Sequence, residues 1–184
     1  MALTRIGRSS RVRGRSSLPP KAQVLQGHRL GSDRMKLRDF FALSSVKLTL
    51  ASSSKDEVLG ELIRLLGLDE KSAANLYKTL KRRENLGSTG IGHGIAIPHC
   101  RSLVVNTLRL AYGRKRDGMA FDSVDGEPVH HFFLIVAPPP EVSNQYLPVL
   151  GKIAQFAKDP AIPKRLSHLT EPAEFLKLLE ERAS

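Results

Sequence analysis

Hydrophobic and polar positions follow two different periods along the chain, and both begin close to residue 35. Apolar residues that alternate with polar ones at 46–50 and 107–113 predict half-buried strands, and the apolar-rich run at 129–136 predicts another strand. Apolar residues spaced three and four positions apart predict helices, which cover about 54–66, 69–83, 144–158, 160–168 and 171–182.

Local signals mark where these elements begin and turn. Ser54 and Glu57 have the spacing of a capping box, and Thr170 is expected to cap the last helix. Asp125-Gly126 is a turn signal that precedes the strand at 129–136. Helices alternating with strands, together with this hairpin, predict an α/β fold. We expect a single domain with a central mixed β-sheet flanked by helices on both sides.

Charge divides the chain into two parts. Residues 1–34 hold eight basic residues and one acidic residue, a net +7 of the chain's +11, and they show no sustained apolar period. We therefore expect 1–34 to be a basic, disordered or even untranslated extension, and 35–184 to form the folded domain. A transit peptide, or a basic arm for nucleic acid or anionic lipid, are the alternatives. Because the folded part carries little net charge, no nucleic-acid partner is expected.

Several other classes of protein are disfavoured. No apolar run approaches the ~20 residues that span a bilayer, so no membrane span is predicted. Cys100 is the single cysteine, which excludes an internal disulfide and fits a cytoplasmic location. His130 and His131 are neighbours on a strand and face opposite sides of the sheet. With no carboxylate or thiol at ligand spacing, we predict no metal and no cofactor.

The segment that carries chemistry ends at His99. Four glycines, at 87, 90, 92 and 94, allow unusual backbone conformations and a close approach of N–H groups to an anion. The segment is not a nucleotide P-loop, because His93 rather than lysine follows Gly92. It is not a dinucleotide-binding loop either, because Ile95 stands where a third glycine is needed.

Pro98 restricts the backbone on both of its sides and presents the imidazole of His99 at a set angle. Neutral imidazole is nucleophilic and can accept and donate a phosphoryl group without a metal. Arg83 offers a planar, permanently charged fork for phosphoryl oxygens. From these residues alone, a loop histidine and a helix-end arginine with structural roles are an open alternative.

Arg83-Glu84, followed by Gly-Ser-Thr-Gly-Ile-Gly-His-Gly-Ile-Ala-Ile-Pro-His at 87–99, closely resembles the active-site signature of bacterial phosphotransferase-system IIA domains, type 2 (mannitol/fructose class). Looser similarity extends from 35 to 183. The resemblance implies that His99 takes a phosphoryl group on Nε2 from a histidine phosphocarrier protein, with Arg83 beside it. The phosphate pocket is expected to contain Ser88, Thr89, Gly90, Gly92, Gly94 and Tyr146.

The chain is most similar to the nitrogen-regulatory member of this family. That resemblance implies a phosphoprotein whose phosphorylation state controls targets such as potassium-transport or sensor-kinase components. Tyr146 stands where family members often have a second histidine, and its neutral phenol favours regulation over sugar transport. Two alternatives are a sugar-specific IIA component that passes phosphate to a IIB partner, and a binding regulator that does not depend on phosphate.

Overall fold

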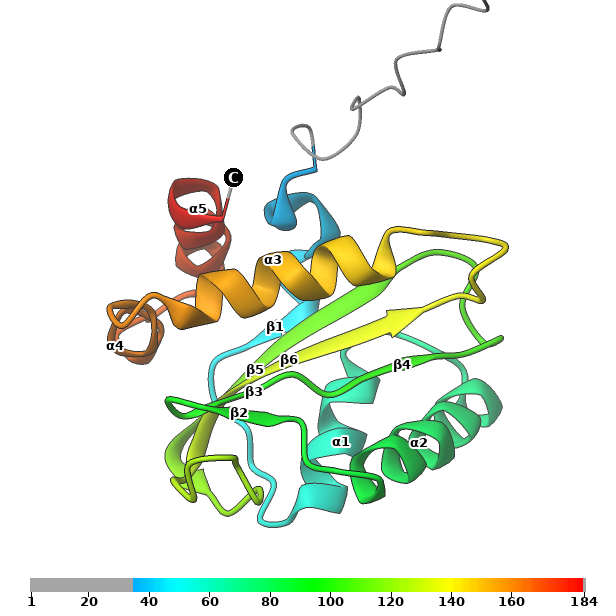
Figure 1. Cartoon of the computed structure of the whole chain (residues 1–184), viewed down its shortest axis with the longest axis horizontal. Helices are drawn as coiled ribbons and strands as arrows, with labels where there is room; N and C mark the ends of the chain where they lie inside the picture. Colours follow the sequence, from blue (N-terminus) through cyan, green and yellow to red (C-terminus); the bar gives the residue numbers. More distant parts are fainter. Residues whose placement is uncertain (1–34, 184) are drawn as a thin grey trace, which may run out of the picture. The chain divides into compact units, whose positions relative to one another are not determined.

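The computed structural model describes residues 35–183 of the chain. The predicted extension 1–34 lies outside the described residues. Six strands form one mixed sheet in the order β1-β5-β6-β3-β2, and β4 also pairs with β6 (Figure 1). The strands are β1 Val46–Lys47, β2 Gly90–Gly92, β3 Ile95–Ala96, β4 His99–Arg101, β5 Arg109–Met119 and β6 Val129–Ala137.

Strands β5 and β6 form the predicted antiparallel hairpin, and Gly126 in its turn has φ 75°. Strands β3 and β4 run parallel to β6 along successive parts of the same edge of that strand. Strand β6 is therefore central, with β5 on one side and with β3 and β4 on the other. Strand β1 is parallel to β5, and β2 is antiparallel to β3. Parallel and antiparallel pairs in one sheet confirm the predicted mixed topology.

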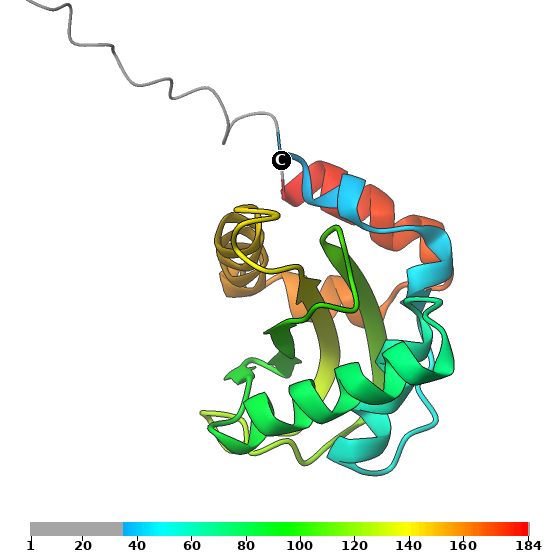
Figure 2. The ribbon, with the colours of Figure 1, turned by 90° about the vertical axis from the view of Figure 1, so that its right-hand side faces the viewer.

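Helices cover both faces of the sheet (Figures 1 and 2). Helices α1 Lys55–Arg64 and α2 Glu70–Asn85 lie on one face. The other face carries α3 Tyr146–Lys158, α4 Ile162–Ser167 and α5 Pro172–Arg182, together with two short 3-10 helices, η1 Leu37–Phe40 and η2 Leu43–Ser45. This arrangement confirms the α/β fold. No helix in the described range has the length and apolar character needed to cross a membrane.

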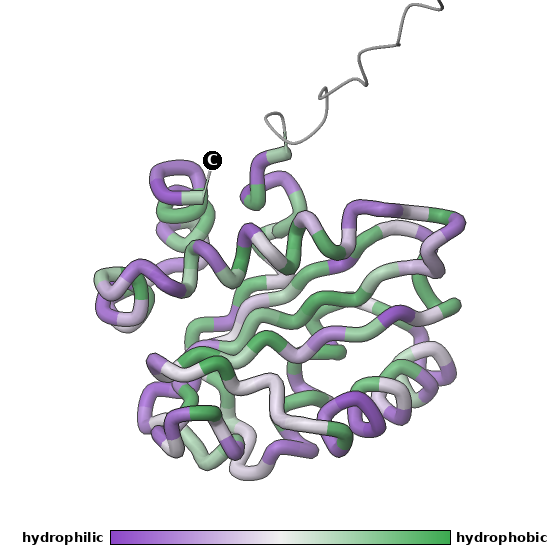
Figure 3. The backbone as a smooth tube through the Cα atoms, in the orientation of Figure 1, coloured by the Kyte–Doolittle hydropathy of each residue, from purple (hydrophilic) through white to green (hydrophobic). Residues whose placement is uncertain are grey.

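Strand β6 is apolar from Phe132 to Ala137, where both of its faces are buried. Phe133 and Ile135 face the core under α3 and α5, whereas Phe132 and Leu134 face the core over α1 and α2. The hydrophobic colour in Figure 3 follows these central strands. The sheet is therefore the rigid middle layer on which the candidate site is built.

Three local predictions need correction. Strand β1 covers only two residues of the predicted 46–50: the Leu48 carbonyl accepts from the side-chain Nε of Arg114 (2.9 Å) rather than from a backbone N–H of β5, although the Leu50 N–H still donates to the Arg114 carbonyl (2.8 Å). Strand β5 begins two residues later than predicted and runs on to Met119. The N-cap position of α5 is Glu171 rather than Thr170, because Pro172 sets the first helical position, and the Glu171 side chain makes no capping hydrogen bond.

Candidate functional site

His99 is the first residue of β4 and pairs with Ile135 of the central strand. The backbone on its N-terminal side is held at two points. The Pro98 carbonyl accepts from the Ile135 N–H (2.9 Å), and the Ile97 N–H donates to the Thr89 carbonyl (3.0 Å). The proline thus interrupts the strand between β3 and β4 without loosening it, and the half-buried His99 side chain starts from a fixed backbone.

The imidazole of His99 has a defined tautomer. Its Nδ1 lies 2.6 Å from the Ile97 carbonyl oxygen. A carbonyl oxygen only accepts hydrogen bonds, so Nδ1 carries the proton and Nε2 keeps its lone pair. Burial of the ring lowers the pKa of His99 below its ordinary value, and the nearby charge of Arg83 lowers the pKa further. The ring is therefore a neutral nucleophile at physiological pH.

Arg83 lies in the last turn of α2, close enough to His99 for its charge to lower the pKa of that ring. Its Nη1 donates to the Gly87 carbonyl (2.9 Å), which anchors the guanidinium to the loop that follows the helix. Among the described residues it has no ion pair. Its remaining donors and its charge are available to an anion at His99.

Tyr146 is the first residue of α3, and its ring centroid lies 6.2 Å from that of His99. Burial raises the pKa of the phenol, so Tyr146 is neutral and retains a hydroxyl donor. Arg101 is a neighbour that the sequence analysis missed: its guanidinium carbon lies 4.6 Å from the centroid of the Tyr146 ring. Residues two apart on a strand share a face, so the spacing of His99 and Arg101 was a usable signal.

Ser88 and Thr89 use their hydroxyl groups within the protein. Ser88 Oγ donates to the Phe121 carbonyl (2.6 Å), and Thr89 Oγ1 donates to Glu84 (2.6 Å). The Thr89 N–H also donates to the Glu84 carboxylate, which is buried and paired with Lys55 (3.1 Å). These bonds shape the loop between α2 and β2. Direct contact of either hydroxyl with a phosphate stays a prediction.

Gly90, Gly92 and Gly94 form the β2–β3 hairpin, which packs against the 121–131 segment. A Cβ on Gly90 would lie 2.8 Å from the Ser123 Cα, so only glycine fits this close approach. The Gly92 N–H donates to Ser123 Oγ (3.0 Å), and the Gly94 carbonyl accepts from the backbone of 130 and 131. None of these contacts reaches His99, and the role of the three glycines in a phosphate pocket remains untested.

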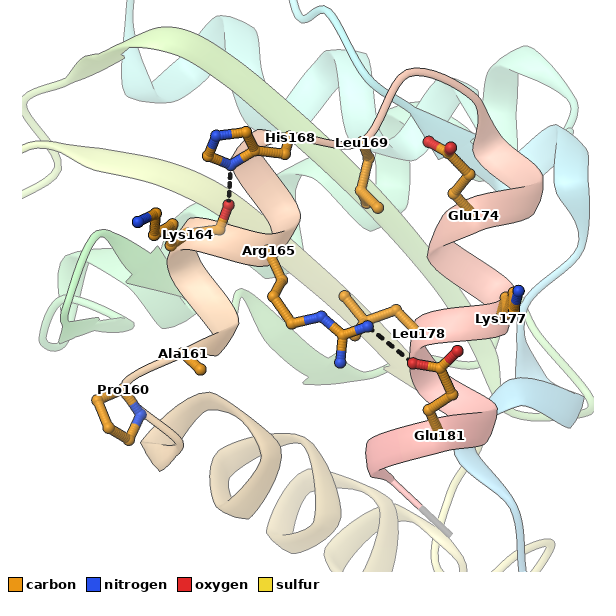
Figure 4. Close-up of a pocket in the computed structure, with 10 residues that line it drawn as sticks. All are labelled: Pro160, Ala161, Lys164, Arg165, His168, Leu169, Glu174, Lys177, Leu178 and Glu181. Atoms are coloured by element: carbon orange, nitrogen blue, oxygen red, sulfur yellow. Dashed lines mark hydrogen bonds and ion pairs between the residues drawn. The ribbon is translucent and has the colours of Figure 1, made fainter.

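A cavity of about 600 Å³ lies between α4 and α5 (Figure 4). The ion pair of Arg165 with Glu181 (2.7 Å) joins the two helices across it, and apolar side chains such as Leu169 and Leu178 line it. None of the predicted site residues lines this cavity. The candidate chemistry is instead at a half-buried histidine on the sheet. No set of three metal-ligating side chains occurs within residues 35–183.

Comparison with known proteins places this site in a family context. The family model "Phosphoenolpyruvate-dependent sugar phosphotransferase system, EIIA 2" matches residues 39–182. A nitrogen regulatory protein of Bradyrhizobium diazoefficiens is 32% identical over 136 residues, which cover 72% of this chain and 86% of that protein. The fructose-specific EIIABC component of Bacillus subtilis is 34% identical over 137 residues, but the match spans only 21% of that longer protein.

Solved structures agree with this assignment. The nitrogen regulatory protein IIA-Ntr of Neisseria meningitidis superposes with a TM-score of 0.68 and 30% identity, covering 78% of this chain and 98% of that one. The mannitol IIA protein of Escherichia coli superposes with a TM-score of 0.61 at 19% identity, covering 76% and 98%, and shows the shared fold.

Proposed function

The chain belongs to the EIIA type 2 family of the phosphoenolpyruvate-dependent sugar phosphotransferase system, and from this premise we propose that it is a phosphocarrier whose acceptor is His99. Members of this family are components of phosphoryl transfer. We further propose that the phosphorylation state of His99 controls partner proteins. The observation that carries the proposal is the hydrogen bond from His99 Nδ1 to the Ile97 carbonyl, which leaves Nε2 nucleophilic beside Arg83.

In the proposed step the lone pair of His99 Nε2 forms a bond to phosphorus. The bond from phosphorus to the histidine nitrogen of the carrier breaks, and that nitrogen keeps the electron pair. Nδ1 retains its proton, so the phosphorylated ring becomes a cation, and the Ile97 carbonyl oxygen faces the charged N–H. Since no proton leaves His99, no general base is needed. Arg83 would bind the phosphoryl oxygens during the transfer.

Exposed apolar side chains near the site support a protein as the phosphoryl donor. Leu86 ends α2 three residues after Arg83 and is 82% exposed. Leu147 follows Tyr146 in α3 and is 67% exposed, and Leu103 follows β4 and is 85% exposed. These three side chains neighbour Arg83, Tyr146 and His99 in the sequence and are exposed for contact with a protein partner. A small phosphocarrier protein that brings its own phosphohistidine fits this requirement.

Regulation is favoured over sugar transport by two observations. Several relatives that match over most of their own length are named nitrogen regulatory proteins. In addition, Tyr146 offers a neutral donor where a charged second histidine would assist onward transfer. Potassium-transport and sensor-kinase components are the target classes that we propose. The sugar-specific alternative is supported by the similarity to the fructose-specific EIIABC component. A mannitol IIA protein of Escherichia coli has also been solved in complex with its phosphorylated IIB partner.

The central experiment is labelling of the protein by phosphoenolpyruvate, enzyme I and the histidine phosphocarrier protein. Wild type should incorporate one phosphoryl group, and His99→Ala should incorporate none. His93→Ala is the matched control, because His93 is exposed in the same segment and its variant should be labelled like wild type. Labelling of His99→Ala, or no labelling of wild type, refutes the phosphocarrier function.

The regulatory part requires a second measurement. Binding partners captured on unphosphorylated wild type should be released when His99 is phosphorylated, or captured only then. If His99→Ala and His99→Asp bind and control the same targets as wild type under phosphorylating conditions, the protein is a phosphate-independent binding regulator. Rapid transfer of the label to a IIB protein identifies it as a sugar-specific component.

A further inference from the structure

Arg101 has a set of contacts that the phosphocarrier role of His99 does not by itself require. Its guanidinium carbon lies 4.6 Å from the centroid of the Tyr146 ring, within the range of a cation–π interaction. Its Nη1 donates to the Pro138 carbonyl (2.7 Å) and lies 3.4 Å from the Ser143 carbonyl oxygen. Arg101 thus joins β4 to both ends of the segment 138–143, which leads from β6 to α3.

The strand geometry places this arginine on the side of β4 that carries the acceptor. His99 and Arg101 are both half-exposed, whereas Cys100 between them is buried in the opposite core. The ring of Tyr146 lies near both residues, 6.2 Å from the His99 ring and against the Arg101 guanidinium. The phenol ring therefore neighbours both the nucleophile and a cation that cannot lose its charge.

We propose that Arg101 is a positioning residue for phosphoryl transfer: it fixes the ring of Tyr146 beside His99, so that the Tyr146 hydroxyl can donate to a phosphoryl oxygen. The proposal rests on the phosphocarrier function of His99. Under this proposal, Arg101 and Tyr146 together take the role that a second, charged histidine would have beside His99. The phenol supplies the hydrogen bond, and the guanidinium supplies a permanent positive charge behind it.

The physical argument concerns the mobility of Tyr146. It is the first residue of α3, and Gln145 before it makes no side-chain capping bond. A helix terminus without a capping side chain frays readily, and a frayed terminus would move the phenol away from His99. Arg101 restricts this motion in two ways. It donates a hydrogen bond to the loop that precedes α3, and its guanidinium packs on the Tyr146 ring. Pre-organised donors contribute most when they do not have to reorient during the reaction.

Charge is the second part of the argument. The positive charges of Arg83 and Arg101 both favour the ionised form of Tyr146, but burial outweighs them and raises the pKa of the phenol. A dianionic phosphoryl group at His99 would thus meet the charge of Arg83 and a neutral hydroxyl donor, whose ring is packed against the guanidinium of Arg101. Neither guanidinium titrates near neutral pH, so this electrostatic stabilisation does not change across the physiological range.

The test is the single-turnover rate of His99 phosphorylation at varied, excess concentrations of the phosphorylated carrier, which gives the maximal rate constant (kcat) and the half-saturating carrier concentration (KM). Arg101→Ala should lower kcat about tenfold, consistent with loss of a partly desolvated cation–π contact. The KM for the carrier should change by less than about threefold, because positioning acts on the transfer step. Arg101→Lys retains the charge and should recover at least part of the lost rate. Arg109→Ala is the control, because this exposed arginine on β5 has no ion pair among the described residues.

A double-mutant comparison separates positioning from a direct or a structural role. If Arg101 acts through Tyr146, then Arg101→Ala should lower kcat by less than about twofold in a Tyr146→Ala background. The ring resonances of His99 in NMR spectra should shift in Arg101→Ala, while amide resonances of α5 should not, which shows that the fold is retained. Tyr146→Phe keeps the stacked ring and should lose rate by removing the hydroxyl donor.

The outcomes are distinct. A normal rate in Arg101→Ala overturns the proposal, and so do strictly additive effects of the two substitutions. An increase in KM with unchanged kcat also overturns it, because Arg101 would then be a docking residue for the carrier. No labelling of the wild-type protein would instead refute the phosphocarrier function. If Arg101→Ala fails to fold, a lowered kcat of Arg101→Lys that is no longer lowered in a Tyr146→Ala background supports the proposal, and a wild-type rate of Arg101→Lys, or additivity with Tyr146→Ala, overturns it.

Discussion

The side-chain Nδ1 of His99 lies 2.6 Å from the main-chain carbonyl oxygen of Ile97, two residues earlier in the chain. Pro98 between them makes this contact dependable, because it removes one backbone torsional freedom where the ring must turn back. A histidine held in this way has one free nitrogen, and that nitrogen is Nε2. The contact thus determines both which atom reacts and where the proton stays.

The rate of His99 phosphorylation is expected to be insensitive to pH over an unusually wide range. The neutral ring is the nucleophile, and burial together with Arg83 lowers the pKa of His99. A base with a lowered pKa stays neutral to more acidic pH, so the rate should remain flat from pH 8 to below 6.5 and fall only at lower pH. Rapid-quench labelling with pre-phosphorylated carrier measures the profile. A midpoint above 6.5 would contradict the expectation.

Arg83→Ala should reduce the rate of phosphorylation by about 10- to 100-fold, as expected when a charged donor to the transferred group is removed. Arg83→Lys should recover only part of the rate, since an ammonium group cannot form the two-pronged contact. Arg82→Ala provides the control, because Arg82 is exposed on the same turn of α2 and has no ion pair among the described residues. If His99 is phosphorylated equally fast in Arg82→Ala and Arg83→Ala, Arg83 does not bind the transferred phosphoryl group.

Sequence reasoning succeeded where one local pattern determines the structure. The spacing of apolar residues identified the main helices and the β5–β6 hairpin, and Pro98 followed by His99 indicated a fixed imidazole. Sequence reasoning failed where the local structure depends on a contact between segments that are far apart in the sequence. The side chain of Arg114 binds the carbonyl of Leu48, which lies far away in sequence, and Arg101 meets Tyr146 because the loop after β6 brings α3 to β4. A one-dimensional pattern contains no information on such contacts.

Glu84→Gln is expected to lower the free energy of unfolding by about 2 kcal/mol. The carboxylate of Glu84 is buried, accepts from the N–H and Oγ1 of Thr89, and pairs with Lys55 at 3.1 Å. An amide can replace only part of this set, and Lys55 keeps a second partner in Asp122 (2.9 Å), which limits the loss. Urea denaturation measures the change.

The same substitution should also slow phosphorylation of His99, because Glu84 anchors the loop that Arg83 binds at Gly87. Glu70→Gln is the matched control, since Glu70 is exposed in the first turn of the same helix. If Glu84→Gln and Glu70→Gln are equally stable, the buried carboxylate does not hold the loop as the hydrogen bonds indicate.

His131 should make the protein less stable as the pH falls toward 4. Its ring is buried between Tyr112, whose hydroxyl lies 2.9 Å from Nδ1, and Ser167 on α4. Burial lowers the pKa of His131 to about 4, and the positive charges of His130 and Arg114 act in the same direction. The unfolded chain binds a proton near pH 6.5, but the folded protein does so only near pH 4. Stability is therefore full above 6.5 and is lost between those values, by up to about 3 kcal/mol.

Urea denaturation of wild type and His131→Gln at pH 7, 6, 5 and 4.5 tests this expectation. Glutamine can still hydrogen bond to Tyr112 and Ser167 but does not titrate, so its unfolding free energy should fall less steeply with pH than that of wild type. His168→Gln is the control, because His168 is exposed at the end of α4. Glu61, whose pKa is lowered from 4.5 to about 2, also loses stabilisation at the acidic end of this range, but it is present in both proteins and cancels in the difference between them. Equal slopes for wild type and His131→Gln would show that the pKa of His131 is the same in the folded and the unfolded protein, contrary to the expectation.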